Sequence, residues 1–154
     1  MQKDYKRMEY NEFLQYINKL CDHLEKYIQD NKIRIDYICP VLRSGAVPAI
    51  YITYTLNIVK LLPVQVKHIA YQNGENKIEM IFNPFDSIQI EKKEPVFLVV
   101  EAMHSTGTSV EICINEIKNR FNLEWSKLNK KKWLPLIVIK GKQNITIVAI
   151  RYTK

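Results

Sequence analysis

The stretch from Pro95 to Ser109 constrains the fold of this 154-residue chain more than any other part of it. Residues 96–100 are five consecutive apolar residues, four of them β-branched or aromatic, which predicts a strand buried on both faces. The strand ends at Glu101, a turn of small hydroxyl residues and one glycine follows, and apolar residues then return with helical spacing. This order of strand, short turn and helix indicates an α/β fold.

The turn after this strand predicts a site for one phosphate group. Free backbone N–H groups and the positive end of a helix dipole point at such a turn, and hydroxyl side chains add donors. The turn is too short for a Walker A loop and lacks its Gly-Lys-Ser/Thr. Glu101 places a carboxylate beside the phosphate. The candidate phosphate-binding residues are Ser105, Thr106, Gly107, Thr108 and Ser109.

A second unit of strand, turn and helix lies earlier in the chain. Residues 36–42 predict a buried strand, Arg43-Ser44-Gly45 form a small-residue turn with an arginine at its mouth, and an apolar helix is expected from Pro48 to Leu56. Standing alone, this stretch is an ordinary tight turn with a surface arginine. Open sheets bind ligands at the carboxyl ends of parallel strands, so the pair of turns favours one shared anion site.

The remaining segments alternate in the same way and predict an α/β fold with a mainly parallel sheet of about five strands flanked by helices. Asn73-Gly74 is a strong hairpin signal, which predicts an antiparallel pair around it. Outside the two units already described, the expected elements are a helix over 11–30, strands over 61–71 and 77–82, a strand over 134–140 and a last strand over 145–152.

Composition fits one domain spanning 1–154 and excludes several classes of protein. Apolar residues at 47% and charged residues at 25% argue against disorder, and no window has the apolar length of a membrane helix. The N-terminus has no signal-peptide pattern, and three scattered cysteines in apolar patterns predict core thiols of a cytoplasmic protein. The net charge of +7 fits either a polyanionic small substrate or a nucleic acid.

The stretch that follows the buried strand resembles the phosphoribosyl-diphosphate (PRPP) motif of type I phosphoribosyltransferases. Glu101 takes the position of the first acid, residues 103–104 that of an apolar pair, and residues 106–109 that of the phosphate cradle. Two positions depart from the motif. Ala102 stands where a second ribose-binding acid is expected, and Ser105 stands where many purine enzymes carry the Asp proposed as general base.

Other segments resemble the same family in the order that the family has them. Arg43-Ser44-Gly45 looks like the pyrophosphate loop, and the Val-Pro-Ala that follows is similar to the hypoxanthine/xanthine–guanine purine salvage branch. The hairpin at Asn73-Gly74 resembles the mobile flap, with Tyr71 in it. Lys140 matches the lysine that meets the base in purine enzymes. Only residues 141–144 stand where the family inserts a hood, so a very small hood is implied.

The resemblance implies transfer of a phosphoribosyl group from PRPP to a nucleobase, with release of pyrophosphate and a nucleoside monophosphate. Glu101 would hold a ribose hydroxyl, and Ser105 would occupy the catalytic-base position. Mg²⁺ would be the cofactor, held mainly by PRPP, pyrophosphate and water, with no side chain required as a metal ligand. The family also implies a homodimer.

Three classes of function remain open from the sequence. The first is an active phosphoribosyltransferase of purine salvage. The second is a PRPP- or nucleotide-binding regulator that kept the phosphate cradle, which Ala102, Ser105 and the short hood favour. The third is a nucleic-acid-binding protein that uses the positive charge and the lysines at 130–132, and it is the weakest because no DNA- or RNA-binding motif is present.

Overall fold

The computed structural model describes residues 9–71, 74, 76–90, 95–102, 108–120, 137–140 and 144–151, the last two ranges by their backbone. The described elements alternate between helix and strand, as the sequence predicts. In chain order they are α1 (Tyr10–Asn31), β1 (Tyr37–Leu42), α2 (Ala46–Leu56), β2 (Val64–Ala70), β3 (Asn76–Phe82), the 3-10 helix η1 (Pro84–Asp86), β4 (Val96–Glu101), α3 (Thr108–Arg120), β5 (Ile137–Lys140) and β6 (Asn144–Arg151).

The strands form one mixed sheet in the order β3-β2-β1-β4-β6-β5. β1 is parallel to both β2 and β4, whereas β3 is antiparallel to β2. β6 is antiparallel to β4 and to β5, so β5 runs in the same direction as β4. The prediction of an α/β fold with a mainly parallel sheet is confirmed, since only β3 and β6 run against the others. The described sheet has six strands, which overlap the six strand ranges that the sequence predicts.

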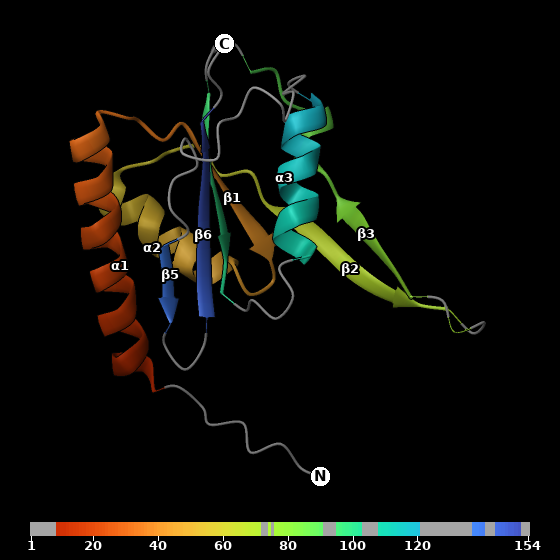
Figure 1. Ribbon diagram of the computed structural model, residues 1–154, viewed down its shortest axis with the longest axis horizontal. Helices are drawn as coiled ribbons and strands as arrows, with labels where there is room; N and C mark the ends of the chain where they lie inside the picture. Colours follow the sequence, from red (N-terminus) through yellow and green to blue (C-terminus); the bar gives the residue numbers. More distant parts are fainter. Residues whose placement is uncertain are drawn as a thin grey trace.

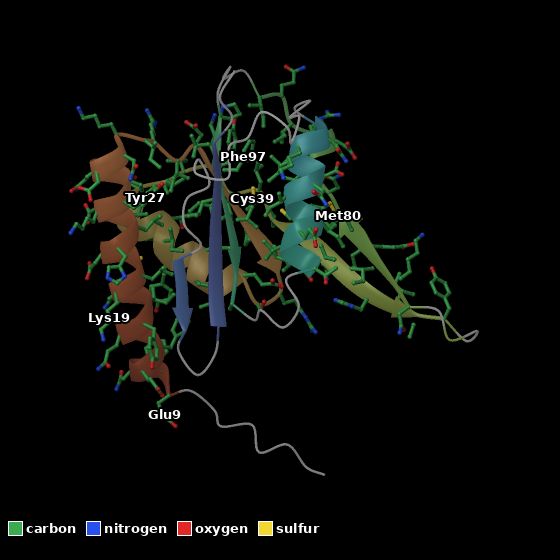
Figure 2. All side chains as sticks on the ribbon, in the orientation of Figure 1. Glu9, Lys19, Tyr27, Cys39, Met80 and Phe97 are labelled. Atoms are coloured by element: carbon green, nitrogen blue, oxygen red, sulfur yellow. The ribbon has the colours of Figure 1, made fainter. Side chains whose placement is uncertain are left out.

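Helices cover both faces of the sheet, as Figure 1 shows, with α1 and α2 on one side and α3 on the other. β4 has all six residues buried, which confirms a strand buried on both faces. Its side chains alternate between the two layers: Leu98 and Val100 pack with α1 and α2, whereas Phe97 and Val99 pack with α3. Figure 2 shows Cys39 and Met80 on the α3 side of the sheet.

The β2–β3 hairpin extends past the end of β1. Val41 of β1 pairs with Val64, the first residue of β2, so β2 begins where β1 is about to end. β3 then returns antiparallel, and Gly74 lies between the two strands with φ 82°, a left-handed conformation that favours glycine. Figure 1 shows the hairpin projecting away from the helices. The antiparallel pair predicted around Asn73-Gly74 is therefore confirmed.

Other expectations for single residues agree with the structure. All three cysteines are free and buried, as predicted for core thiols. The helix predicted from Pro48 begins at Ala46, which keeps Pro48 in its first turn. Among the described helices, none combines the length and the apolar character that a bilayer crossing needs.

Candidate functional site

The two predicted turns begin at the ends of neighbouring parallel strands. β1 and β4 pair in register, with Pro40 opposite Val100, so the ends of both strands lie level at the carboxyl edge of the sheet. Arg43 follows the end of β1, and Glu101 and Ala102 stand at the end of β4. The structure therefore brings the two predicted sites together at one edge, where an open α/β sheet binds its ligands.

Gly45 lets the two strand ends approach this closely. A Cβ atom at this position would overlap the carbonyl oxygen of Val100 and would lie only 2.8 Å from the carbonyl oxygen of Val41. The Gly45 φ of −73° is available to any residue, so the glycine is needed for space and not for its backbone freedom. The sequence marked Gly45 as part of a turn but gave no sign that it contacts β4.

The turn after β1 presents a positive charge at the start of a helix. The Ala46 N–H donates to the Arg43 carbonyl at 3.2 Å, and the Gly45 N–H donates to the Val41 carbonyl at 2.9 Å. The Leu42–Arg43 peptide bond is cis. Arg43 is exposed and Ser44 is half-buried. Because α2 begins at Ala46, the guanidinium, the hydroxyl and the amino end of a helix dipole all stand at this turn, which suits an anion.

The end of β4 presents the opposite charge in a buried setting. Glu101 is only 8% exposed, and burial raises its pKa from 4.5 to about 6. Its position in the strand puts it on the same side as Phe97 and Val99, which face α3. Burial raises the pKa of Cys113 on α3 to about 12, and Glu116 and then Glu101 contribute to the same shift, so the Glu101 carboxylate lies near this helix.

Ala102 belongs to the other face of the sheet. Its methyl group packs against the apolar cluster that α1 and α2 form with β4. Residues 101 and 102 therefore point to opposite sides, as alternation along a strand requires. The missing second acid is thus replaced by a side chain that contributes to the apolar layer.

The second half of the predicted phosphate cradle begins a helix. Thr108 and Ser109 are the first two residues of α3, and both are half-buried. An amino-terminal helix end therefore lies on the chain shortly after β4, as the sequence predicts. Ser105, Thr106 and Gly107 lie outside the described residues, as do Met103 and His104.

Tyr71 lies far from this edge in the structure. It follows the last residue of β2 and is 44% exposed. Gln65 pairs with Leu42 at the end of β1, and Tyr71 stands six residues further on, about 20 Å along an extended chain. The structure places Tyr71 in the hairpin but does not bring it to the two turns.

Lys140 ends β5, and its backbone lies at the same edge of the sheet as Glu101. Glu101 pairs with Thr146 of β6, and Thr146 pairs in turn with Val138 of β5. Lys140 is two residues further toward the carboxyl edge, on a strand that is about 10 Å from β4 across the sheet. In the part of the chain that the structure describes, no three His, Cys, Asp or Glu side chains gather to hold a metal ion.

Comparison with solved structures identifies the fold. A purine phosphoribosyltransferase from Pyrococcus horikoshii Ot3 is similar with a TM-score of 0.58 and 23% identity, over 73% of this chain and 67% of that one. A hypothetical protein from Neisseria gonorrhoeae with bound ppGpp is similar with a TM-score of 0.58 and 16% identity, over 73% of this chain and 62% of that one.

These likenesses show an α/β fold of the phosphoribosyltransferase type. The chain spans about two thirds of the first neighbour and less than two thirds of the second. No protein-family model matches the chain, and no curated protein does.

Proposed function

We propose that this protein binds PRPP at the carboxyl edge of its sheet and transfers the phosphoribosyl group to a nucleobase. The proposal rests on the close approach of the ends of β1 and β4, which Gly45 permits. This approach places the turn with the exposed Arg43 next to the strand end with the buried Glu101. PRPP carries its pyrophosphate on the anomeric carbon of the ribose and a hydroxyl on each of the two ring carbons that follow. A cation and a carboxylate at adjacent strand ends match that order of groups.

Each end of the ligand has candidate partners in the proposal. Arg43 and Ser44 hold the pyrophosphate through the guanidinium and the hydroxyl, and Gly45, whose N–H already donates to the Val41 carbonyl, contributes to the pyrophosphate site by keeping the turn close to β4. Residues 105–109 hold the 5′-phosphate, with Thr108 and Ser109 at the amino end of α3 supporting this role. Glu101 accepts a hydrogen bond from a ribose hydroxyl.

The reaction breaks the bond between the anomeric carbon and pyrophosphate and forms a bond to a ring nitrogen of the base. Positive charge develops on the sugar during this displacement, and an ionised Glu101 nearby stabilises it. Mg²⁺, if bound with PRPP, would neutralise charge on the leaving pyrophosphate. Ser105 is no base at neutral pH, so the proton of the attacking nitrogen passes to water.

The accepting base in this proposal is a purine of the hypoxanthine or guanine type, and the setting is purine salvage in the cytoplasm. Support comes from the Val47-Pro48-Ala49 segment and from the fold shared with a purine phosphoribosyltransferase. Lys140 supports the same assignment, because its backbone ends β5 at the ligand edge. Tyr71 would reach the ligand only when the β2–β3 hairpin closes over it, which excludes water from the reacting centre.

A nucleotide-binding regulator is the second candidate, and Ala102 is the observation that favours it. The methyl group packs into an apolar layer, so the ribose has one carboxylate where an active transferase of the family would offer two. A neighbour of this fold contains bound ppGpp, a guanine nucleotide. In this alternative the same edge binds a purine nucleotide without turnover.

A transfer assay tests the two candidates together. Labelled PRPP and Mg²⁺ are incubated with hypoxanthine, guanine, xanthine, adenine, uracil or orotate, and calorimetry measures binding of PRPP and of ppGpp. A labelled nucleoside monophosphate supports the transferase, and binding without product assigns the regulator. If neither PRPP nor ppGpp binds, both candidates are wrong.

A variant in the cradle checks where the phosphate binds. Gly107→Val should abolish binding of PRPP and of nucleoside monophosphates, because a side chain there blocks the approach of backbone N–H groups to the phosphate. Circular dichroism and the melting temperature show whether the fold is kept. Unchanged affinity for both ligands would contradict the assignment of residues 105–109.

A further inference from the structure

The end of strand β3 is tied to helix α3 by one side chain. Asn83 directly follows β3, and its Nδ2 donates a hydrogen bond to Glu116 Oε1 of α3 at 2.8 Å. Its Oδ1 accepts from the Phe85 N–H at 3.0 Å and so caps the 3-10 helix η1. The carboxylate accepts and the N–H donates, so the orientation of the Asn83 amide is fixed. Figure 1 shows the end of β3 beside α3.

Helix η1 is in turn fixed to the core. Phe85 is fully buried, and its ring meets the ring of Phe97 of β4 edge-on, with the centroids 6.2 Å apart. Pro84, the first residue of η1, is also buried. Because η1 is held in the core, a movement of β3 at its end acts on the Asn83 amide and, through it, on α3.

The other strand of the hairpin is attached to the sheet over a short length. Among the described residues, β2 pairs with β1 at Val64 and Gln65, and from Val66 to Ala70 its partner is β3. A register shift between Gln65 and Val66 indicates a β-bulge, which is a point where a strand bends. The bulge and Asn83 therefore stand at the bases of the two strands, and these two points determine the orientation of the hairpin.

Helix α3 connects this contact with the candidate site. Glu116 lies eight residues after Thr108, about 12 Å along the helix axis, and Thr108 and Ser109 are the described part of the phosphate cradle. The buried side of α3 packs in the same apolar layer as Phe85. A helix that keeps its hydrogen bonds moves as one rigid element, so a displacement at Glu116 also displaces the amino end of α3.

We propose that Asn83 is a positioning residue that couples the β2–β3 hairpin to α3. A phosphate group bound at the amino end of α3 then sets the orientation of the hairpin, and with it the position of Tyr71. This ligand-dependent half of the inference rests on the proposed function. Because such coupling is reciprocal, a hairpin released from Glu116 lowers the affinity of the site for the phosphate.

Amide NMR spectra of the full chain without ligand test the coupling at this one contact. Asn83→Asp keeps the acceptor for the Phe85 N–H but sets an oxygen against Glu116 Oε1 in place of the donor. Asn83→Asp combined with Glu116→Gln restores the hydrogen bond with donor and acceptor exchanged. We expect Asn83→Asp to shift the amide resonances of the hairpin and those of residues 108–111, and the double variant to return both sets to their wild-type positions.

Asp86→Asn is the matched control, because it changes a second contact between η1 and α3. Asp86 Oδ1 lies 3.9 Å from Arg120 Nη1, both side chains are exposed, and such a pair contributes little. This variant should leave both sets of resonances in place. If Asn83→Asp does not fold, Glu116→Ala takes its place, because it removes the contact with α3 and keeps the Asn83–Phe85 hydrogen bond.

Shifts confined to the neighbours of residues 83 and 116 overturn the proposal, because Asn83 is then a local anchor, and so does an equal effect of Asp86→Asn. Calorimetry with Mg²⁺ and PRPP tests the ligand-dependent half. The affinity should fall about tenfold in Asn83→Asp and recover in the double variant, and an unchanged affinity overturns this half. If PRPP does not bind the wild type, the proposed function is wrong, and the amide shifts still decide whether Asn83 couples the hairpin to α3.

Discussion

The ends of β1 and β4 share one architecture and differ in chemistry. Each strand is followed along the chain by a helix, and the two strand ends lie level in the sheet. After β1 the turn presents the exposed cation Arg43, whereas β4 ends in the buried carboxylate Glu101. An exposed arginine suits a multiply charged group that stays partly in water, and a buried carboxylate suits a hydroxyl. In the proposed function, this repeated unit therefore binds two different parts of one ligand.

The largest expected effect comes from forcing the two ends apart. Gly45→Ala places a methyl group where the Val100 carbonyl oxygen lies, so the arginine turn has to move away from β4. We expect the free energy of unfolding to fall by on the order of 3 kcal/mol, at the upper end for overpacked positions. Binding of PRPP should be lost as well. Urea unfolding and calorimetry measure the two effects.

Gly74→Ala is the matched control for this change. No atom lies within 4 Å of a Cβ built at Gly74, so only its positive φ of 82° is costly, at about 1 kcal/mol. If the Gly45→Ala protein is as stable as the Gly74→Ala protein, the packing of the two strand ends does not require a residue without a side chain at position 45.

Removing the cation tests the β1 end alone. Arg43→Ala removes the proposed charge-assisted hydrogen bond to the ligand, a kind of bond that contributes about 1.5–3 kcal/mol, so affinity for pyrophosphate should fall about ten- to a hundredfold. Arg34→Ala removes the same exposed charge just before β1, at the opposite edge of the sheet, and should change the affinity little. Calorimetry with Mg²⁺-pyrophosphate measures both. Equal losses in the two variants would mean that net charge, and not the turn, attracts the ligand.

The β4 end makes a prediction about pH. The pKa of Glu101 in the folded protein is raised to about 6 from 4.5, so the folded state binds the proton more tightly than the unfolded state. The contribution of Glu101 to the free energy of unfolding is therefore fully present below about pH 4.5 and is lost as the pH rises through 6. Relative to Glu101→Gln, the wild type should lose about 2 kcal/mol of unfolding free energy between about pH 4 and pH 8.

Urea unfolding at several pH values between about 4 and 8 measures this difference for the two proteins. Cys113 does not contribute, because its pKa of about 12 keeps the thiol neutral throughout. Glu9→Gln, at an exposed carboxylate ahead of α1, is the control and should follow the wild type. A constant difference between wild type and Glu101→Gln over the whole range would show that Glu101 is solvated like an ordinary surface acid.

Local patterns in the sequence predicted most of this fold. The apolar run 96–100 predicted a strand buried on both faces, and Asn73-Gly74 predicted the hairpin, because burial and turn chemistry both act over a few residues. Each of the six strands overlaps a range that the sequence predicts as a strand. The position of β6 between β4 and β5 depends on long-range pairing, which no local pattern encodes.

The candidate site was predictable in its residues but not in its distances. Arg43 and Glu101 were both marked, and the parallel register of β1 and β4 does bring them to one edge. The contact of Gly45 with Val100 depends on how two strands fit together, and the distance of Tyr71 depends on how far β2 extends past β1. The opposite orientation of Glu101 and Ala102 follows from strand alternation and was within reach of the sequence.

The smallest expected effect comes from giving the β4 end a second acid. In Ala102→Asp the new carboxylate starts from a position that packs against the apolar layer of α1 and α2. Leaving it there ionised and unpaired costs on the order of several kcal/mol of stability, which favours a rotamer turned toward the ligand edge. A hydrogen bond to the ribose felt in the transition state then speeds pyrophosphate release about tenfold, or about 1.4 kcal/mol.

Ala102→Asn separates charge from shape in this last experiment, since the amide has the size of the acid without its charge. A gain for Asp alone, increased further when Ser105→Asp is added, indicates a transferase whose rate is limited by the missing carboxylate. If neither variant shows any turnover although both still bind PRPP, the protein is assigned to regulation. The site then lacks more of what the reaction needs than one carboxylate. In that case the arginine turn and Glu101 serve to hold a nucleotide, and their difference in charge and burial is a matter of recognition alone.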